Sequence, residues 1–389
     1  MPGLVLKREQ IQRRGWPGHP RDEVPGGGHD DHESQCEGWL VSGGNTKGTE
    51  LASISPATAA VRPAKGLIML AKIRGAACAL MLLGGTVPAL ALDKVTVSVN
   101  PVSSALPYFI AVDRGYFKDA GIETEMKRIA VPTLAISGMV AGQIDAVAVI
   151  LAIDAANADI KKPGVITFIA LNAQSTKYRM EQFVVRKGYA AKTLADLKGA
   201  RIACVPGLGN ITLAKAALAK AGLKDGDYQL DQLEMAQHIN VLKSAQYDAA
   251  YTLEPGGTMM DQMDIGKTID AGIIANIILG DPSANAYVGG AALSQDFIKS
   301  RPDVARRYAE AWNKALDLIA NDPKEARKYL LNNTVTPESV VDTVPLLLHT
   351  PVAKLSAQDK KNFQAYVDYA ISLGAISEKI DMTQFLKAY

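Results

Sequence analysis

A glycine-containing turn between a predicted strand and a predicted helix carries the strongest local chemistry in the sequence. It reads Val205-Pro206-Gly207-Leu208-Gly209-Asn210-Ile211-Thr212. The first N–H groups of a helix have no partner within the helix, and the helix dipole adds to their preference for an anionic or acceptor-rich ligand. Glycine allows such a ligand to approach the backbone. The turn therefore predicts ligand contacts at Gly209, Asn210, Ile211 and Thr212, although a turn that only begins a helix has the same residues.

The same turn partly matches the glycine fingerprint of dinucleotide-binding proteins. Gly207 and Gly209 have the required spacing, and Thr212 takes the place of the third glycine. Glu234 ends the next predicted strand, where an acidic residue binds the ribose in such proteins. The motif alone is weak, so a dinucleotide-binding oxidoreductase remains only an alternative.

Residues suited to nucleophilic or metal chemistry are few after residue 91. His238, His349 and Cys204 are far apart in the sequence, and such sites need several ligands or partners close together. His349 ends an apolar run and Cys204 lies within a predicted strand, so both are expected to be buried structural residues. His238 lies where a strand meets a helix and is a candidate for a cleft. The sequence predicts no metal, no cofactor and no enzymatic activity.

Short β-rich runs alternate with amphipathic helical runs, which predicts an α/β fold with two parallel-rich sheets. The first block has predicted strands at 94–100, 122–128, 145–150 and 165–171, and predicted helices at 107–120 and 131–142. The second block has predicted helices at 193–198 and 210–221, and predicted strands at 200–205, 229–234 and 248–251.

Two extended apolar runs, 181–186 and 284–293, lie where the chain would pass between the blocks. Two such crossings predict a hinged protein, with residues 92–186 and 284–389 in lobe 1 and residues 187–283 in lobe 2. The last hundred residues are predicted to be helical. One helical face there is apolar and is expected to be core; it consists of Val304, Tyr308, Trp312, Ala315, Leu316 and Ile319.

The N-terminal segment differs from the rest of the chain. Residues 1–68 contain 11 Gly and 6 Pro, a composition that predicts disorder. Residues 69–91 have a basic start, an apolar stretch at 75–87 and small residues before Ala91, as in a secretory signal peptide. The apolar stretch is too short for a membrane anchor. We expect translation to begin at Met69 and cleavage near Ala91, with a genuine long extension as the alternative.

Composition limits the class of protein further. The chain has 389 residues, 48% of them apolar and 21% charged, with 42 basic and 40 acidic residues, as in a soluble globular protein of two domains. No basic block recurs, so nucleic-acid binding is not expected. Of three cysteines only Cys204 lies after residue 91, so no disulfide framework is expected either.

Five segments in order resemble a known family. They are residues 111–121, 140–145, 194–199 and 247–250, and the pair Glu254-Pro255. Together they resemble the nitrate/sulfonate/taurine (thiamine-precursor-like, NMT1/THI5-like) family of periplasmic substrate-binding proteins of ABC importers. Many relatives have Trp before the Glu-Pro pair, whereas this chain has Leu253. The resemblance covers nearly all of the chain after the signal peptide, and it does not specify the ligand.

The resemblance implies a two-lobed periplasmic-binding-protein fold of type II. It further implies a small-molecule ligand captured between the lobes, an ABC permease as partner, a periplasmic location and a monomer. Ligand contacts are then expected where loops meet the cleft at strand ends. The further candidates are Ser103, Ser104, Tyr108, Phe109, Pro132, Thr133, Ile150, Gln174, Ser175, His238 and Glu254. For Tyr108 and Phe109 a core-facing helix turn is an equal expectation.

Glu254 is a candidate because Pro255 suits the first position of a helix, and Glu is then an unusual residue at the cap. We hypothesise that its carboxylate faces the cleft. A competing function within the family is a pyrimidine-precursor synthase-like enzyme, which acts on its own histidine and uses a cysteine-rich iron site. Cys204 stands alone here.

Overall fold

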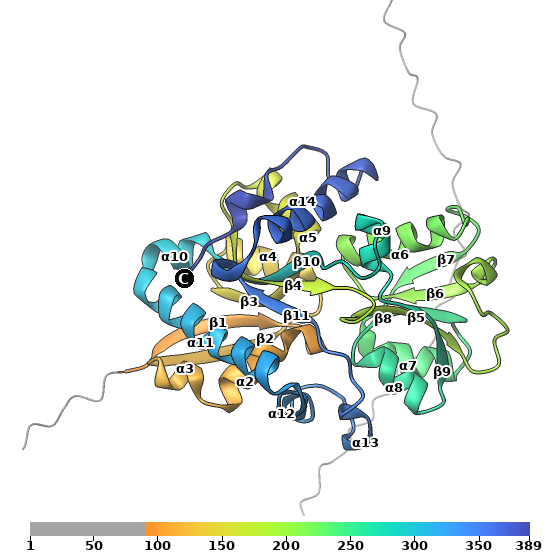
Figure 1. Cartoon of the computed structure of the whole chain (residues 1–389), viewed down its shortest axis with the longest axis horizontal. Coiled ribbons are helices and arrows are strands. Elements are labelled where there is room, and N and C mark those ends of the chain that lie inside the picture. The colour runs from red at the N-terminus through yellow and green to blue at the C-terminus, as the bar shows by residue number, and fades with distance from the viewer. Residues whose placement is uncertain (1–90) are drawn as a thin grey trace, which may run out of the picture. The chain divides into compact units, whose positions relative to one another are not determined.

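The computed structural model describes residues 91–389, whose strands form two mixed β-sheets (Figure 1). These residues belong to a single unit of the chain. We call the six-stranded sheet with its helices lobe 1, and the five-stranded sheet with its helices lobe 2. The expected disordered segment and all of the expected signal peptide except Ala91 lie outside the described residues.

The sheet of lobe 1 has the strand order β11-β4-β10-β3-β1-β2. β1 is parallel to β2 and to β3, as expected for strands joined by helices. β10 is antiparallel to β3 and β4, and β11 is antiparallel to β4. The strands are β1 (Asp93–Val99), β2 (Ile122–Arg128), β3 (Ala146–Leu151), β4 (Ile166–Gln174), β10 (Ala286–Ser294) and β11 (Leu348–Pro351).

The sheet of lobe 2 has the strand order β7-β6-β8-β5-β9. β6 is parallel to β7 and β8, whereas β5 is antiparallel to β8 and β9. Both sheets are thus mixed, because β10 and β11 in lobe 1 and β5 in lobe 2 run against the other strands of their sheets. The strands are β5 (Glu181–Arg186), β6 (Arg201–Cys204), β7 (Gln229–Gln232), β8 (Ala249–Leu253) and β9 (Gly266–Ala271).

Helices cover both sheets, and every helix within residues 91–389 is too short or too polar to cross a bilayer. The α-helices are α2 (Leu106–Asp113), α3 (Tyr116–Asp119), α4 (Pro132–Val140), α5 (Ala152–Lys161), α6 (Leu208–Lys220), α7 (Met235–Lys243), α8 (Gly256–Gln262), α9 (Ile274–Leu279), α10 (Gln295–Ser300), α11 (Pro302–Asn321), α12 (Pro323–Arg327), α13 (Glu338–Val341) and α14 (Ala357–Ser372). Short 3₁₀ helices are η1 (Ser103–Ala105), η2 (Leu194–Leu197), η3 (Lys328–Leu330), η4 (Val352–Lys354) and η5 (Met382–Phe385).

Strand β5 corrects one lobe boundary. Residues 181–186 were assigned to lobe 1, but they pair with β8 and β9 in the sheet of lobe 2. The run is apolar because it is a central strand of that sheet rather than a linker. The first crossing is therefore the segment between β4 and β5, residues 175–180, and the second is the segment between β9 and β10.

Further elements differ from the sequence prediction, among them β9 and α9, which were not predicted. The helix expected at 107–120 is split into α2 and α3, because Gly115 adopts the left-handed conformation with φ of 74°, which glycine tolerates and a continuous helix does not. Helix α5 was not predicted. β11 interrupts the expected helical C-terminal region, where it adds to the edge of the sheet next to β4.

The apolar face of α11 packs into the core of lobe 1, as predicted. Val304, Tyr308, Trp312, Ala315, Leu316 and Ile319 are all buried. The ring of Tyr308 stacks on Phe117 of α3, with the ring centroids 4.7 Å apart. Such aromatic pairs add about 0.5–1.5 kcal/mol beyond their burial.

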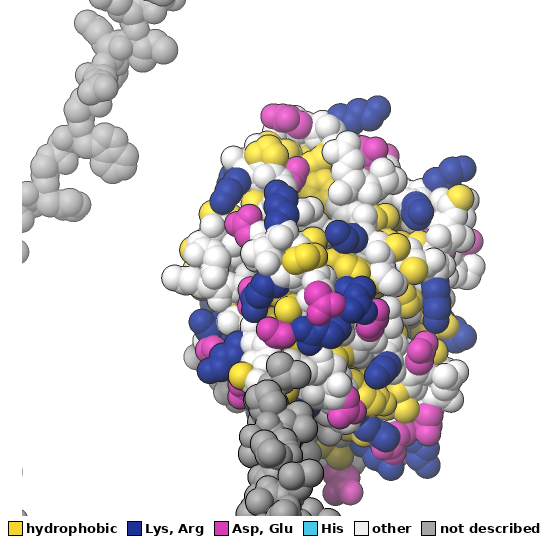
Figure 2. Space-filling model, turned by 90° about the vertical axis from the view of Figure 1, so that its left-hand side faces the viewer, with side chains coloured by type: hydrophobic (Ala, Val, Ile, Leu, Met, Phe, Trp, Pro, Cys, Tyr) yellow, Lys and Arg dark blue, Asp and Glu magenta, His cyan; other side chains and the backbone are white. Residues whose placement is uncertain are grey.

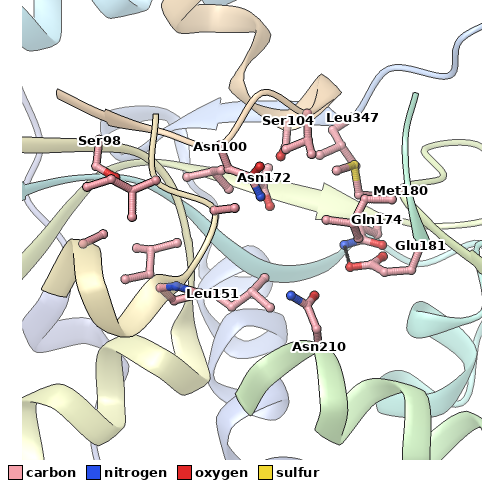
Figure 3. Close-up of a pocket in the computed structure, with 18 residues that line it drawn as sticks. Ser98, Asn100, Ser104, Leu151, Asn172, Gln174, Met180, Glu181, Asn210 and Leu347 are labelled. Carbon is pink, nitrogen blue, oxygen red and sulfur yellow. Dashed lines mark hydrogen bonds between the residues drawn. The ribbon is translucent and has the colours of Figure 1, made fainter. Parts of the chain in front are cut away.

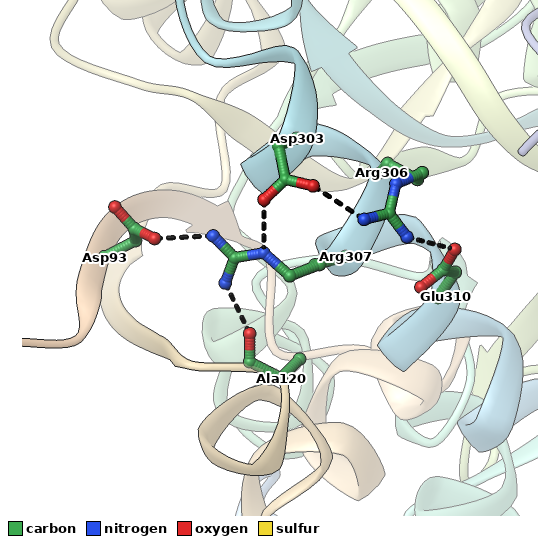
Figure 4. Close-up of polar contacts among 6 residues, drawn as sticks. All are labelled: Asp93, Ala120, Asp303, Arg306, Arg307 and Glu310. Atoms are coloured by element: carbon green, nitrogen blue, oxygen red, sulfur yellow. Dashed lines mark hydrogen bonds and ion pairs between the residues drawn. The ribbon is translucent and has the colours of Figure 1, made fainter. Parts of the chain in front are cut away.

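An ion-pair network fixes the start of α11 against β1 (Figure 4). Arg307 donates to Asp93 Oδ2 at 2.6 Å and to Asp303 Oδ2 at 2.8 Å, and it also donates to the carbonyl of Ala120. Elsewhere on the face of the molecule drawn in Figure 2, basic and acidic side chains are interspersed. Exposed pairs stabilise a fold only slightly, so the network chiefly sets the position of α11.

Candidate ligand-binding site

A cavity lies between the two lobes, at the carboxyl ends of β1, β3 and β4 (Figure 3). This is where α/β sheets present ligands to their loops. Its volume is about 70 Å³, below the roughly 300–1,000 Å³ of pockets for drug-sized ligands. It is lined by Ser98, Asn100, Val102, Ser104, Ile129, Ala130, Pro132, Ala135, Val149, Ile150, Leu151, Asn172, Gln174, Met180, Glu181, Asn210, Leu253 and Leu347.

The two sides of the cavity come from different lobes. Lobe 1 supplies Asn100 after β1 and Asn172 near the end of β4, while lobe 2 supplies Glu181 at the start of β5 and Asn210 in the first turn of α6. A group bound between them would therefore touch both lobes.

A buried amide–carboxyl pair is the most polar part of the wall. Gln174 Nε2 donates to Glu181 Oε1 at 2.7 Å, as the dashed line in Figure 3 shows. Both side chains are almost fully buried. Gln174 Oε1 and Glu181 Oε2 have no hydrogen-bond partner among the described residues. Two buried acceptors are thus left for a ligand or for water, since unpaired buried polar groups are costly.

Burial dominates the electrostatics of this pair. It raises the pKa of Glu181 to about 8, because a charged carboxylate loses its hydration in the interior. Burial also raises the pKa of Tyr251 on β8 and of Tyr366 on α14, and the nearby Glu181 carboxyl raises both further.

Close contacts between the lobes depend on two glycines at the start of α6. A β-carbon at Gly207 would lie 3.1 Å from Pro132 Cγ, and φ at Gly207 is 116°. A β-carbon at Gly209 would lie only 2.6 Å from Leu151 Cδ1. The glycine turn was expected to admit a ligand to the backbone. In this structure the space beside the turn is filled by side chains of lobe 1.

The first turn of α6 also faces a carboxyl group of the chain itself. Asp154, near the start of α5, is buried. Burial raises the pKa of Asp154 to about 6, against the smaller lowering effect of the Gly209 and Leu208 N–H groups. The anion-binding position predicted at this helix start is therefore approached by Asp154 from lobe 1.

The sequence of the chain matches the NMT1/THI5 like family over residues 103–326, more than half of its length. The chain belongs to this family. The match confirms the resemblance drawn from the sequence motifs. No curated protein matches the chain.

Solved structures similar to this NMT1/THI5-like protein share its fold at low identity. The alkanesulfonate-binding protein SsuA from Xanthomonas axonopodis pv. citri, bound to MOPS, is 20% identical with a TM-score of 0.61, over 76% of this chain and 99% of that one. The periplasmic nitrate-binding protein NrtA from Synechocystis PCC 6803 is 15% identical with a TM-score of 0.60, over 75% and 84%. The desulfurization enzyme DSZB is also 15% identical, with a TM-score of 0.56, over 76% and 96%. The expected α/β, two-lobed binding-protein fold is thus confirmed.

Five of the residues predicted to contact a ligand line the cavity of this NMT1/THI5-like protein. They are Ser104, Pro132, Ile150, Gln174 and Asn210. All five follow or end a strand of lobe 1 or begin a helix, which is the rule that selected them. The Nδ2 group of Asn210 donates to the carbonyl of Pro206 at 2.8 Å, so its Oδ1 remains the free end of the amide.

Other candidates from the first lobe lie elsewhere. Ser103 Oγ donates to the sulfur of Met180 at 3.4 Å and does not line the cavity. Tyr108 and Phe109 are buried in the core of lobe 1, which was the equal expectation for them. Thr133 is exposed on α4, and Ser175 Oγ accepts from the N–H of Tyr178 at 3.3 Å in the first crossing.

The remaining candidates in lobe 2 pack within the protein and do not line the cavity. Gly209 contacts lobe 1, Thr212 is buried in α6, and Ile211 packs against the core. His238 is buried on α7, where its Nε2 lies 3.0 Å from the carbonyl of Leu233, and burial lowers its pKa to about 4. Its candidacy for the cleft is not supported by this position.

The position of Glu254 contradicts the hypothesis that its carboxylate faces the cleft. Its Oε1 accepts from Gln182 Nε2 at 2.7 Å and from Thr258 Oγ1 at 2.8 Å, and its Oε2 accepts from the Thr258 N–H at 3.2 Å. The side chain is 1% exposed and does not line the cavity. Its carboxylate therefore stabilises the start of α8 within lobe 2 instead of facing the cleft.

The sequence reasoning missed Asn100, Asn172 and Glu181. Asn172 and Gln174 are two residues apart on β4, where every residue is buried, and Glu181 begins the buried strand β5. Polar residues within apolar strands were the signal that could have found them, because a buried polar group needs a partner.

The residues suited to nucleophilic chemistry stay away from the cavity. Cys204 is buried on β6, and burial raises the pKa of its thiol to about 12. Burial lowers the pKa of His349 on β11 to about 4. Within residues 91–389 no three His, Cys, Asp or Glu side chains gather as metal ligands would.

Proposed function

We propose that the chain is a periplasmic solute-binding protein that captures a small ligand between its two lobes and delivers it to an ABC permease. The single observation that carries this proposal is the cavity at the carboxyl ends of β1, β3 and β4, closed from the other side by β5 and α6. The two polypeptide crossings leave the lobes free to hinge around such a site. Family membership supports the same function.

The proposal includes export and two lobes in the boundaries given above, with residues 181–186 moved to lobe 2. The signal peptide expected at residues 69–91 supports a periplasmic location, as do similar proteins named as periplasmic. We expect the exported protein to act as a monomer.

A thermal-shift screen tests ligand capture directly. The compounds are nitrate, alkanesulfonates, taurine, aminopyrimidines and small aromatic acids. A ligand at 100 times its dissociation constant stabilises the folded state by about 2.7 kcal/mol. Small-angle scattering with a compound that binds should then show a smaller radius of gyration. A bound ligand without any change in the radius of gyration would contradict capture by hinge closure.

An enzyme is the second candidate, because the desulfurization enzyme DSZB shares the fold over most of its length. The buried positions of Cys204 and His238 speak against a nucleophile in the cavity of this chain. The iron content of the purified protein tests the synthase-like alternative. Stoichiometric iron would favour the enzyme.

A further inference from the structure

The ionisable side chain in the cavity wall is a carboxyl group. Glu181 is 2% exposed, and its Oε2 lacks a partner among residues 91–389. Gln174, which is 1% exposed, binds the other carboxyl oxygen and leaves its own Oε1 unpaired. Two oxygens without a partner therefore belong to one hydrogen-bonded pair in the wall, one on β4 of lobe 1 and one on β5 of lobe 2.

The described residues of the cavity wall do not favour an anionic ligand. Among the described residues that line it, none is Lys or Arg; the other polar members are serines and amides. A second carboxyl group, Asp154, approaches the start of α6 from lobe 1. A buried anion needs a cation or several converging donors. Nitrate or a sulfonate would instead meet Glu181 without a positive partner in this part of the chain.

We propose that the cavity binds a small nitrogen compound whose N–H groups donate to Glu181 Oε2 and Gln174 Oε1, and that it discriminates against small anions. This inference rests on the proposed function, since it names the ligand class of the same site. Of the possible donors, an amidinium group fits best, because its two N–H groups can reach two neighbouring acceptors and its positive charge complements the carboxylate.

The remaining walls limit the size of such a ligand. Ile129, Val149, Leu151, Met180 and Leu347 give the cavity apolar surfaces, and its volume of about 70 Å³ is small. A compact head group with a short apolar part fills this space. A longer ligand requires the lobes to separate.

Binding of a cationic donor is coupled to the release of a proton from Glu181. The carboxyl group of Glu181, whose pKa burial raises to about 8, is mainly protonated at neutral pH in the empty protein. A cationic donor binds the carboxylate, so the carboxyl proton leaves to the solvent. The affinity for a permanent cation should therefore rise about tenfold per pH unit well below pH 8, and about fivefold between pH 7 and pH 8. An anion would show the opposite trend.

The ionisable groups that face Glu181 do not change the expected pH dependence of binding between pH 7 and 9, because they do not titrate in that range. They are Tyr251 on β8 and Tyr366 on α14, whose pKa values are both raised well above 10 by burial. Beyond them lie Cys204 on β6 next to Tyr251, with a pKa of about 12, and Asp154 on α5 next to Tyr366, with a pKa of about 6. Of these groups Asp154 has the pKa closest to that of Glu181, and its carboxyl group is largely ionised above pH 7.

Calorimetry and thermal shift with two sets of probes test the proposal. The donor set is acetamidinium, methylammonium and acetamide, and the anion set is methanesulfonate, nitrate and acetate. We expect acetamidinium to bind, with an affinity that rises from pH 7 to 8 and a proton release that calorimetry detects in buffers of different ionisation enthalpy. Glu181→Gln should weaken acetamidinium binding at least about tenfold, as for a hydrogen bond to a charged group.

Glu254→Gln is the matched control. It makes the same change in a glutamate that is equally buried in lobe 2 and lies outside the cavity wall. Acetamidinium affinity should survive it.

Binding of the anions but not of the donors would overturn the inference and leave the solute-binding function intact. Equal loss of affinity in both variants would also overturn it, because the effect would then be structural. If neither set shifts the melting temperature, the inference fails, and the wider thermal-shift screen above decides the solute-binding proposal separately.

Discussion

Asp154 of lobe 1 and Gly209 of lobe 2 approach so closely that a β-carbon on residue 209 would lie 3.2 Å from Asp154 Oδ2. The first turn of α6 thus meets the first turn of α5 directly, and glycine is the residue that permits it. In this conformation the two lobes are in direct contact beside the cavity. The start of α6 therefore contributes to closure of the lobes more directly than to an anion site.

Gly209→Ala should hinder this closure. The added carbon would lie 2.6 Å from Leu151 Cδ1, a distance that requires a shift of one lobe or of the leucine. Overpacking of this kind costs about 1–3 kcal/mol, so ligand affinity should fall about 5- to 100-fold, and the radius of gyration with ligand should stay larger than in the wild type.

Gly222→Ala separates closure from general destabilisation. Gly222 follows α6, has φ of 89° and no atom within 4 Å of an added β-carbon, so the change strains the backbone without touching lobe 1. It should lower the melting temperature and leave affinity unchanged. If Gly209→Ala behaves in the same way, the contact with Leu151 and Asp154 has no part in closure.

Glu254→Gln should reduce stability and spare affinity. The carboxylate accepts three hydrogen bonds from Gln182 and Thr258, and a glutamine amide can accept only with its single oxygen. We expect a loss of about 1–2 kcal/mol, seen as a melting temperature a few degrees lower. A tenfold weaker ligand affinity in a folded variant would return Glu254 to the binding site.

The stability of the empty protein should fall as the pH rises from 7.5 to 8.5. Burial raises the pKa of Glu181 from 4.5 to about 8, so the folded state holds a proton that the unfolded state has already lost. This contribution is complete below pH 4.5 and is lost as the pH passes through 8. The buried His238 and the half-buried His349 have pKa values of about 4 in the folded state. In the unfolded state they lose their protons around pH 6.5, so they oppose the slope near that pH and are neutral in both states above about pH 7.5.

Melting temperatures measured across that range check this prediction. In Glu181→Gln the slope should be much shallower, because residue 181 no longer titrates. Glu123→Gln, a change in an exposed glutamate of β2, should keep the slope of the wild type. A slope that Glu181→Gln leaves intact would show that another group binds the proton.

The exported protein should begin near Leu92. This prediction rests on the signal-like residues 69–91, which lie outside the described residues except for Ala91. N-terminal sequencing of protein recovered from the native host measures the cleavage site. Exported protein that retains residues upstream of Met69 would contradict both the start at Met69 and the cleavage.

The sequence by itself determined the α/β class, most strand positions and the family. Strand 122–128 was predicted at its observed bounds, and all six residues predicted for the apolar face of α11 are buried. Both depend on local periodicity, which burial on one face imposes wherever the element lies. The family motifs are also local, since each occupies one turn or one element boundary.

Only the tertiary structure decided which polar residues meet. Gln174 and Glu181 belong to different sheets, and Asp154 reaches the start of α6 from the other lobe. Local patterns do not encode such pairs, because they depend on how the two crossings orient the lobes. For the same reason Glu254, whose sequence position suggested the cleft, faces Gln182 and Thr258 instead.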